Sequence, residues 1–144
     1  MATILAHITV KPGTAPAFES VARSLHETSH RLEEGLLRYE YWRGAEENTY
    51  YTLLSFTDHR TFIAHQTSDH HEDASPELRD IIASIRLEWV DPIEGASPLP
   101  STADQDAPDD ADELTRRYRQ LYAAAVAPWW EPLRPEEHAG GADA

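Results

Sequence analysis

The amino-acid sequence predicts an α+β fold whose strands and helices follow the order β-α-β-β-α-β. Two observations carry this prediction. Segments in which apolar residues occupy every second position alternate, along residues 3–91, with segments in which they recur at helical spacing. The composition then changes near residue 92, where proline-rich, acidic sequence begins. We therefore expect one α+β domain followed by an extension of different character.

The first strand is predicted over residues 3–10. Ile4 and Ile8 lie on one face of this segment and Leu5 and His7 on the other, which is the period of two that a pleated strand requires. The Lys-Pro-Gly sequence that follows is typical of a turn, so the chain reverses there.

The first helix is predicted from Thr14, a residue type that favours the N-cap position, to Glu34. Phe18 and Leu25 are among the apolar residues that share one face at helical spacing. Gly35 follows, as glycine commonly does at the C-terminal end of a helix.

A β-hairpin is predicted next. Residues 36–43 and 49–56 are rich in aromatic and aliphatic side chains, which favour strands. The intervening segment contains Gly44 and Asn48, two residue types that suit a hairpin turn. We expect these two strands to pair antiparallel.

The remaining elements are two short helices and a last strand. Asp58 is a predicted N-cap for a helix that ends near His65. Ser75 and Pro76 predict the start of a second helix, because proline is favoured in the first turn. Residues 85–91 alternate as a strand. The complete order is that of the ferredoxin-like fold, and the sheet face without helices is expected to pack on a second copy, on the extension, or on both.

Composition excludes several classes of protein. The chain has 12 Lys and Arg residues against 26 Asp and Glu residues, a net charge of −14, which disfavours binding to nucleic acids and anionic membranes. It contains no cysteine, so disulfides, thiolate nucleophiles and Cys-ligated metals are excluded. It contains no apolar run of membrane-spanning length. We expect a cytoplasmic protein.

The extension is predicted to have two parts beyond a domain at residues 1–92. Residues 93–108 are a Pro-rich acidic linker, and residues 109–144 are an amphipathic helix and a disordered tail that ends in HAGGADA. Pro128 is expected to end this helix. Its apolar stripe comprises Leu114, Tyr118, Leu121, Tyr122, Ala125 and Val126.

The position of this helix is left open by the sequence. It can pack on its own domain, cross to a second subunit, cover a pocket as a lid, or dock on a partner protein. Trp129 and Trp130 add two large aromatic side chains immediately after Pro128.

Three segments resemble the antibiotic biosynthesis monooxygenase superfamily of dimeric α+β barrels: ILAHITVKPG, EEGLLRYEYWR and YYTLLSFTDHRTFIAHQTSDHH. The resemblance covers residues 2 to about 92. Its most specific part is a strand followed by Asp58, a short helix, His65, four intervening residues and His70. The resemblance implies a homodimer that acts on a small molecule.

The superfamily includes cofactor-independent oxygenases of aromatic polyketides, haem-degrading enzymes and isomerases, so the fold does not select the reaction. Resemblance places His65 and His70 at recurring histidine positions, and Arg79 at the position of an arginine that some aromatic oxygenases carry. Phe56 stands where oxygenases and haem degraders have tryptophan. The haem ligand position falls near Ser75, which disfavours haem degradation.

The function that the sequence favours is a cofactor-independent monooxygenase, an oxidoreductase that uses molecular oxygen on an aromatic or polyketide-like metabolite. Such an enzyme needs a base that deprotonates a phenol or enol in a dry pocket, and His65 and His70 are the candidates. Arg79 is the candidate cation for the developing anion. The candidate substrate-binding residues are Trp42, Tyr50, Thr52, Phe56, Phe62 and Trp89.

Two other functions stay open: an isomerase or cyclase that moves protons without oxygen, and a non-catalytic binding or accessory protein. The two histidines can also cap helix ends, and Arg79 can be a surface ion-pair partner. His26 and His30 share a helix face at a spacing that metals can use, but no third ligand is implied. We expect no cofactor and no native metal site.

Overall fold

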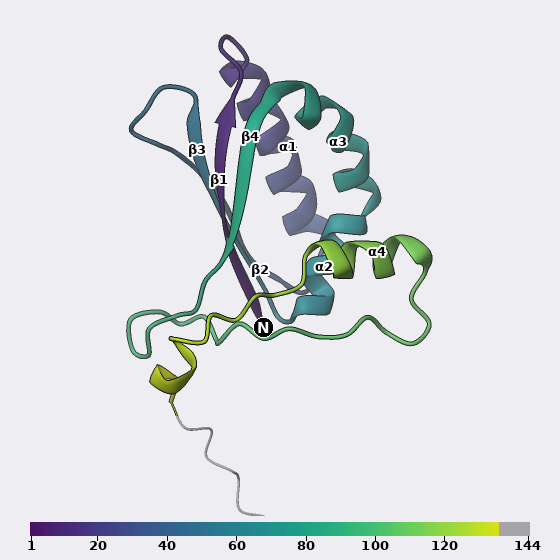
Figure 1. Ribbon diagram of the computed structural model, residues 1–144. Helices are drawn as coiled ribbons and strands as arrows, with labels where there is room; N and C mark the ends of the chain where they lie inside the picture. The colour runs from purple at the N-terminus through teal and green to yellow at the C-terminus, as the bar shows by residue number, and fades with distance from the viewer. Residues whose placement is uncertain (136–144) are drawn as a thin grey trace, which may run out of the picture.

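The computed structural model describes residues 1–135 and has the predicted ferredoxin-like α+β architecture with an additional C-terminal helix (Figure 1). The predicted HAGGADA tail lies outside the described residues. The elements in chain order are β1 (Ala2–Val10), α1 (Ala15–Leu32), β2 (Leu36–Arg43), β3 (Thr49–Phe56), α2 (His59–Thr67), α3 (Asp69–Ile81), β4 (Ile82–Trp89), α4 (Glu113–Leu121) and the 3₁₀ turn η1 (Glu131–Leu133).

The four strands form one antiparallel sheet in the order β2-β3-β1-β4. Helices α1 and α3 cover one face, while none of the α-helices within residues 1–135 covers the opposite face (Figure 1). The central strand β1 pairs Ile4 with Leu54 on one side and with Trp89 on the other, so these side chains share the helix-covered face. The hydrophobic core lies between this face and the helices.

The chain between α1 and β2 differs from the prediction. Helix α1 ends at Leu32, and Glu33 is the C-cap with an extended backbone, so Gly35 is not the capping residue. Gly35 serves another purpose, because a Cβ atom at this position would lie 2.3 Å from Cγ2 of Thr61 in α2. The glycine therefore permits the connection to pass close to α2.

Asp58 is the N-cap of α2, as predicted, and its Oδ1 accepts a hydrogen bond of 2.7 Å from the amide of Thr61. The predicted start of the following helix at Ser75 is wrong. Helix α3 begins at Asp69, because the Ser68 side chain caps it there, and Pro76 lies inside the helix. A proline inside a helix removes one backbone hydrogen bond and its ring crowds the carbonyl four residues earlier, which is that of Glu72 here. Strand β4 accordingly begins at Ile82 rather than at residue 85.

The segment after β4 lies against the end of the sheet where β1 begins. Thr102 is fully buried there, accepts a hydrogen bond from the amide of Thr3 (3.2 Å) and donates one to the carbonyl of Val90 (2.6 Å). The amide of Ala103 donates to the carbonyl of Met1 (2.7 Å). These contacts hold part of residues 93–108 on the domain.

Helix α4 packs on α2 and is shorter than predicted, because it ends at Leu121 and not at Pro128. The cause is tertiary. The buried His59 ring donates a hydrogen bond of 2.8 Å from Nε2 to the carbonyl of Tyr122, the C-cap residue. Nδ1 of the same ring accepts one of 3.2 Å from the amide of Gln105. One core side chain thus holds both the linker and the end of α4.

Candidate active site

A carboxylate and two histidines meet where α1 ends and α3 begins. Nδ1 of His65 lies 2.9 and 3.0 Å from the two carboxylate oxygens of Glu33. Nε2 of His70 lies 2.7 Å from Oε1 of the same carboxylate and 3.1 Å from the hydroxyl of Ser29. The His65 side chain is 1% exposed and the Glu33 side chain 12% exposed, so the cluster is largely withdrawn from water.

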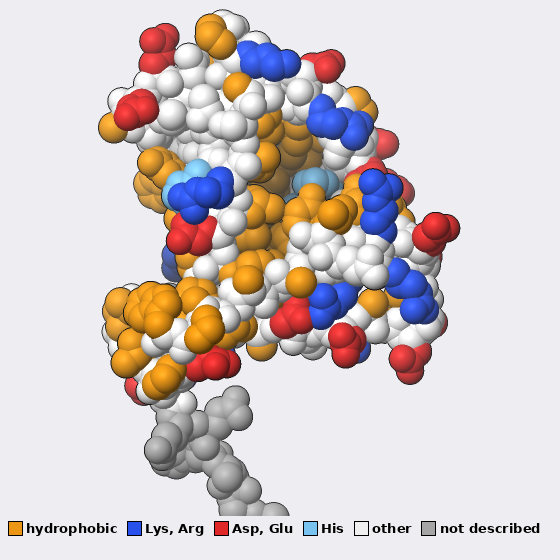
Figure 2. All heavy atoms as spheres, in the orientation of Figure 1, with side chains coloured by type: hydrophobic (Ala, Val, Ile, Leu, Met, Phe, Trp, Pro, Cys, Tyr) orange, Lys and Arg blue, Asp and Glu red, His pale blue; other side chains and the backbone are white. Residues whose placement is uncertain are grey.

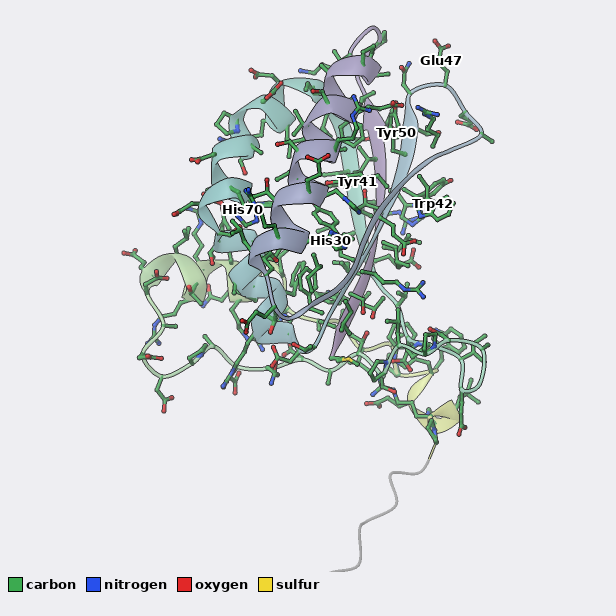
Figure 3. All side chains as sticks on the ribbon, turned by 180° about the vertical axis from the view of Figure 1, so that it is seen from behind. His30, Tyr41, Trp42, Glu47, Tyr50 and His70 are labelled. Carbon is green, nitrogen blue, oxygen red and sulfur yellow. The ribbon has the colours of Figure 1, made fainter. Side chains whose placement is uncertain are left out.

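The local backbone explains this meeting. As the C-cap of α1, Glu33 has left the helical path, which lets its side chain turn toward α2 and α3. His65 lies in the last turn of α2, and Ser68 separates it from α3, which carries His70. Figure 3 shows His70 on the helical side of the molecule, across from the sheet residues.

The charge of Glu33 decides which ring nitrogen of His65 carries a proton. Burial raises the pKa of Glu33, but hydrogen bonds from His65, His70 and Ser29, together with the positive charge that His65 carries when protonated, outweigh burial and hold this pKa below its ordinary value. An ionised carboxylate only accepts hydrogen bonds, so Nδ1 of His65 must donate. In the neutral ring, Nε2 is then an acceptor. The arrangement therefore orients a base.

His65 lines an interior pocket of about 90 Å³ between the sheet and the helices. The pocket walls are mainly apolar and include Phe62 and Leu54. The mouth lies beside Ile85 and Leu87 of β4, both exposed. Figure 2 shows a hollow between β4 and α3 that is lined by hydrophobic side chains and has a histidine inside it.

Four buried polar atoms of residues that line this pocket have no hydrogen-bond partner among the described residues. They are Oγ1 of Thr52, Nε2 of His65, Oε1 of Gln66 and Nδ1 of His71. Buried polar atoms in proteins are almost always paired, so four unpaired atoms around one pocket indicate a place for a polar molecule. A ligand with two or more hydroxyl or carbonyl groups would satisfy them.

His71 contributes a neutral polar group to this pocket. Burial, together with the nearby charges of His65 and His70, lowers its pKa to about 4. The ring centres of His71 and His65 are 4.9 Å apart and the rings meet edge to face. At neutral pH His71 can therefore orient a ligand by hydrogen bonding without adding a charge beside the base.

The residues predicted from sequence are only partly brought together. His65 and His70 meet at Glu33, and Thr52 and Phe62 line the pocket. Phe56 is fully buried behind the pocket, with its ring centre 5.2 Å from that of His65. Arg79 is exposed on α3 and does not line the pocket.

Three other predicted residues lie elsewhere. Trp89 packs edge to face on Phe62, behind the pocket wall. Trp42 and Tyr50 line a larger, open groove of about 600 Å³ between α1 and the edge strand β2. The polar groups of that groove bind each other, since Glu19 accepts hydrogen bonds from Arg43 (2.7 and 2.9 Å) and from Tyr50 (3.0 Å). The smaller pocket has the unpaired groups and the oriented histidine, so we assign the candidate site there.

Sequence reasoning missed three residues of the site: Glu33, Gln66 and His71. Glu33 is the most consequential. It stands in the sequence Glu-Glu-Gly at a helix end, which is typical of a solvated surface, so nothing local distinguished it. Glu33 and His65 are 32 positions apart in the sequence and come into contact only in the folded chain.

Within residues 1–135, the cluster of Glu33, His65 and His70 has its potential ligand atoms close enough together to hold a metal ion. The carboxylate of Glu33, Nδ1 of His65 and Nε2 of His70 all lie within 4.8 Å of one another. Their separations of 2.7 to 3.0 Å from the carboxylate oxygens are those of hydrogen bonds. His26 and His30, the pair considered from sequence, lie on the exposed side of α1 with their rings tilted by 38° and their ring centres 4.2 Å apart.

The model of one protein family, antibiotic biosynthesis monooxygenase, matches residues 1–77, more than half of the 144 residues. The chain belongs to this family. The matched range contains the Glu33, His65, His70 and His71 side chains of the candidate site, whereas β4 and the extension lie beyond it. No curated protein matches the chain.

Solved structures show the same fold. PA3566 from Pseudomonas aeruginosa is 26% identical, with a TM-score of 0.57 over 62% of this chain and 90% of that one. A protein from Caulobacter crescentus CB15 that carries the family's name is 25% identical, with a TM-score of 0.61 over 65% of this chain and 90% of that one. Another of that name, from Nitrosomonas europaea, is 20% identical, with a TM-score of 0.60 over 65% and 99% of the two chains. These matches leave about a third of this chain uncovered.

Proposed function

We propose that this protein is a cofactor-independent monooxygenase in which Glu33 and His65 deprotonate a phenol or enol bound in the interior pocket. One observation carries the proposal: His65, whose Nδ1 donates to the Glu33 carboxylate, lines an apolar pocket, and its Nε2 has no hydrogen-bond partner among residues 1–135. The proposed substrate is an aromatic or polyketide-like molecule. Family membership agrees with an oxidative reaction but does not by itself identify one.

The first step is proton transfer from the substrate to Nε2 of His65. The ring becomes a cation while the Glu33 carboxylate, which accepts from Nδ1, stabilises the new charge at 2.9 Å. The apolar walls favour an electron-rich carbanion that reacts with oxygen, because they keep water from protonating it again. Thr52, Gln66 and His71 orient the remaining polar groups of the substrate.

The second step is oxidation by molecular oxygen. The carbanion transfers one electron to O₂, and the resulting radical and superoxide combine to form a carbon–oxygen bond. His65 returns its proton to the peroxide. Loss of the remaining proton on the same carbon then forms the C=O bond as the O–O bond breaks, and that proton leaves with the expelled hydroxide as water. For a CH₂ group the balance is R₂CH₂ + O₂ → R₂C=O + H₂O, so no external reductant is consumed.

Two further expectations belong to this proposal. The protein acts as a homodimer, in keeping with the open face of its sheet, and it works in the cytoplasm. Within residues 1–135, no helix combines the length and apolar character needed to cross a bilayer.

The test is oxygen uptake with a panel of one-ring enolisable phenols and ketones, the smallest aromatic substrates, because the pocket measures about 90 Å³. We expect one O₂ consumed per carbonyl formed. His65→Gln should lower the rate by about 10²- to 10⁴-fold, the usual contribution of a positioned base. His30→Gln is the matched control, because His30 is exposed on α1, and it should leave the rate unchanged.

Two results would contradict the proposal. One is oxygen uptake by the wild-type protein no faster than the uncatalysed reaction across the panel. The other is substrate rearrangement without oxygen consumption, which would identify an isomerase that uses the same base.

A further inference from the structure

Three large apolar side chains form an exposed surface at the end of the molecule, which we call the shelf: Ile93, Trp129 and Leu133. Their relative exposures are 77%, 73% and 71%. Figure 2 shows the concentration of hydrophobic side chains there, on the part of the molecule occupied by the loop after β4 and by η1. Contiguous exposed apolar patches of this kind commonly mark interaction sites.

The shelf is held rigidly rather than carried on a loose tail. Arg134, directly after η1, forms a two-pronged ion pair with Asp91, with N–O distances of 2.9 and 3.0 Å. The same guanidinium donates a 2.6 Å hydrogen bond to the carbonyl of Thr102. Asp91 also accepts from the amide of Thr102 (2.9 Å). This network fixes Trp129 and Leu133 on one side of the loop that carries Ile93.

The shelf adjoins the open face of the sheet. In Figure 1, η1 and the loop after β4 lie on the side of the strands opposite α1 and α3. In Figure 3, Trp42 points to this same side, away from the helices. Strand alternation places Leu5, Leu53 and Tyr51 on this face as well. Shelf and sheet together form an angled apolar surface.

The charges on this face favour a second copy of the chain as the occupant. The outward charged residues of the strands are two arginines and two glutamates, arranged as the pairs Arg38–Glu40 (3.8 Å) and Arg86–Glu88 (3.2 Å). The positive and negative charges of these strand residues therefore cancel, although the whole chain has a net charge of −14. Two faces without net charge can approach each other without the repulsion expected between two strongly acidic molecules. In a dimer with two-fold symmetry, the arginines of each copy can also pair with the glutamates of the other.

We propose that the shelf contacts a second copy of this chain whose sheet packs on the open face of the first, so that the C-terminal extension enlarges the dimer interface. The proposal goes beyond the proposed reaction and does not depend on it. It assigns a role to residues that lie outside the family match and outside the candidate active site. It also explains why Trp129 of the shelf is exposed to solvent in a single copy of the chain.

The test measures dimer dissociation by sedimentation over a concentration series. A double variant, Trp129→Ala with Leu133→Ser, should raise the dissociation constant about tenfold or more, since buried tryptophans are frequent interface hot spots. The matched control is Leu121→Ser, which removes a similarly exposed leucine (62%) from α4, away from the shelf, and should not change it.

A second measurement keeps the test valid if the double variant folds poorly. The emission of Trp129, isolated as the difference between the wild type and Trp129→Phe, should shift to shorter wavelength as concentration rises through the dissociation constant. An unshifted emission in a protein that dimerises would place the shelf outside the interface. A wild-type protein that stays monomeric at high concentration would overturn the proposal outright. A monomeric wild-type protein would also contradict the homodimer expected under the proposed function, but neither result bears on oxygen uptake, so the proposed reaction and the role of the shelf are tested separately.

Discussion

At the scale of single residues, the site depends on a carboxylate that changes what a histidine can do. A neutral histidine can carry its proton on either ring nitrogen. The ionised Glu33 selects Nδ1 of His65 by accepting from it, and Nε2 is left as an acceptor without a hydrogen-bond partner among the described residues. The same ring without Glu33 would divide between both tautomers.

Substitution of Glu33 tests this dependence. In Glu33→Gln the amide can donate to Nδ1, which favours the tautomer with its proton on Nε2 and removes the base from the pocket. We expect kcat to fall by about 10²- to 10⁴-fold while the affinity for a substrate analogue stays within a few-fold. A steady-state comparison of kcat and KM checks this, and a selective loss of affinity would assign Glu33 to binding alone.

The Glu19–Arg43 pair predicts a pH dependence of stability. Hydrogen bonds from Arg43 and then Tyr50 lower the pKa of Glu19 from 4.5 to about 2. Because the folded pKa is the lower one, this pair stabilises the fold fully above the unfolded value and loses its effect as the pH falls from 4.5 toward 2. Glu19→Gln should therefore destabilise the protein at pH 7 and much less at pH 3. Urea unfolding of both proteins at the two pH values measures the difference, and an equal difference at both would refute this assignment.

At the scale of elements, the helices are aligned by close contacts that periodicity does not reveal. The connection between α1 and β2 passes so near α2 that only glycine fits at residue 35. This approach supports the end of α1, from which Glu33 reaches across to His65 in α2. The geometry of the candidate base therefore depends on a contact between three elements.

Gly35→Ala should destabilise the protein by about 1–3 kcal/mol, the usual cost of overpacking. The added methyl would meet Cγ2 of Thr61 at 2.3 Å and Oγ1 of Thr57 at 2.8 Å. Thr61→Ser removes the nearer atom, so the double variant should recover part of the loss. Chemical denaturation of the four proteins completes a double-mutant cycle, and strictly additive effects would show that the two residues do not meet.

At the scale of the whole molecule, the extension is part of the folded unit. His59 binds the carbonyl of Tyr122 through Nε2 and the amide of Gln105 through Nδ1. Tyr118 of α4 donates to Glu72 of α3, next to His71 of the pocket. The extension thus supports α2 and α3, the two helices that carry the histidines of the candidate site.

His59→Phe should loosen the extension while leaving the domain folded. Phenylalanine fills the buried space but leaves the Tyr122 carbonyl and the Gln105 amide without their partner, which costs about 1–3 kcal/mol. Limited trypsin digestion should cut faster at Arg116 and Arg117 of α4, and far-ultraviolet circular dichroism should change little. Unchanged cleavage would show that other contacts hold α4 in place.

The sequence by itself determined the elements whose signals are local. Alternation placed the strands, Asp58 marked the start of α2, and the element order predicted the ferredoxin-like topology. The resemblance pointed to His65 and His70. The predicted elements were confirmed because backbone periodicity and side-chain capping act over a few residues, whereas the roles of the two histidines stay a prediction.

Tertiary structure alone decided the rest. Pro76 looked like a helix start, yet an upstream cap at Ser68 began the helix earlier. Helix α4 stops early because a buried histidine from α2 binds its last turn. Glu33 resembled a surface residue until the fold placed it beside His65. In each case the deciding partner is distant in sequence or competes with a plausible local signal, so only the packed chain brings the two groups within hydrogen-bonding distance.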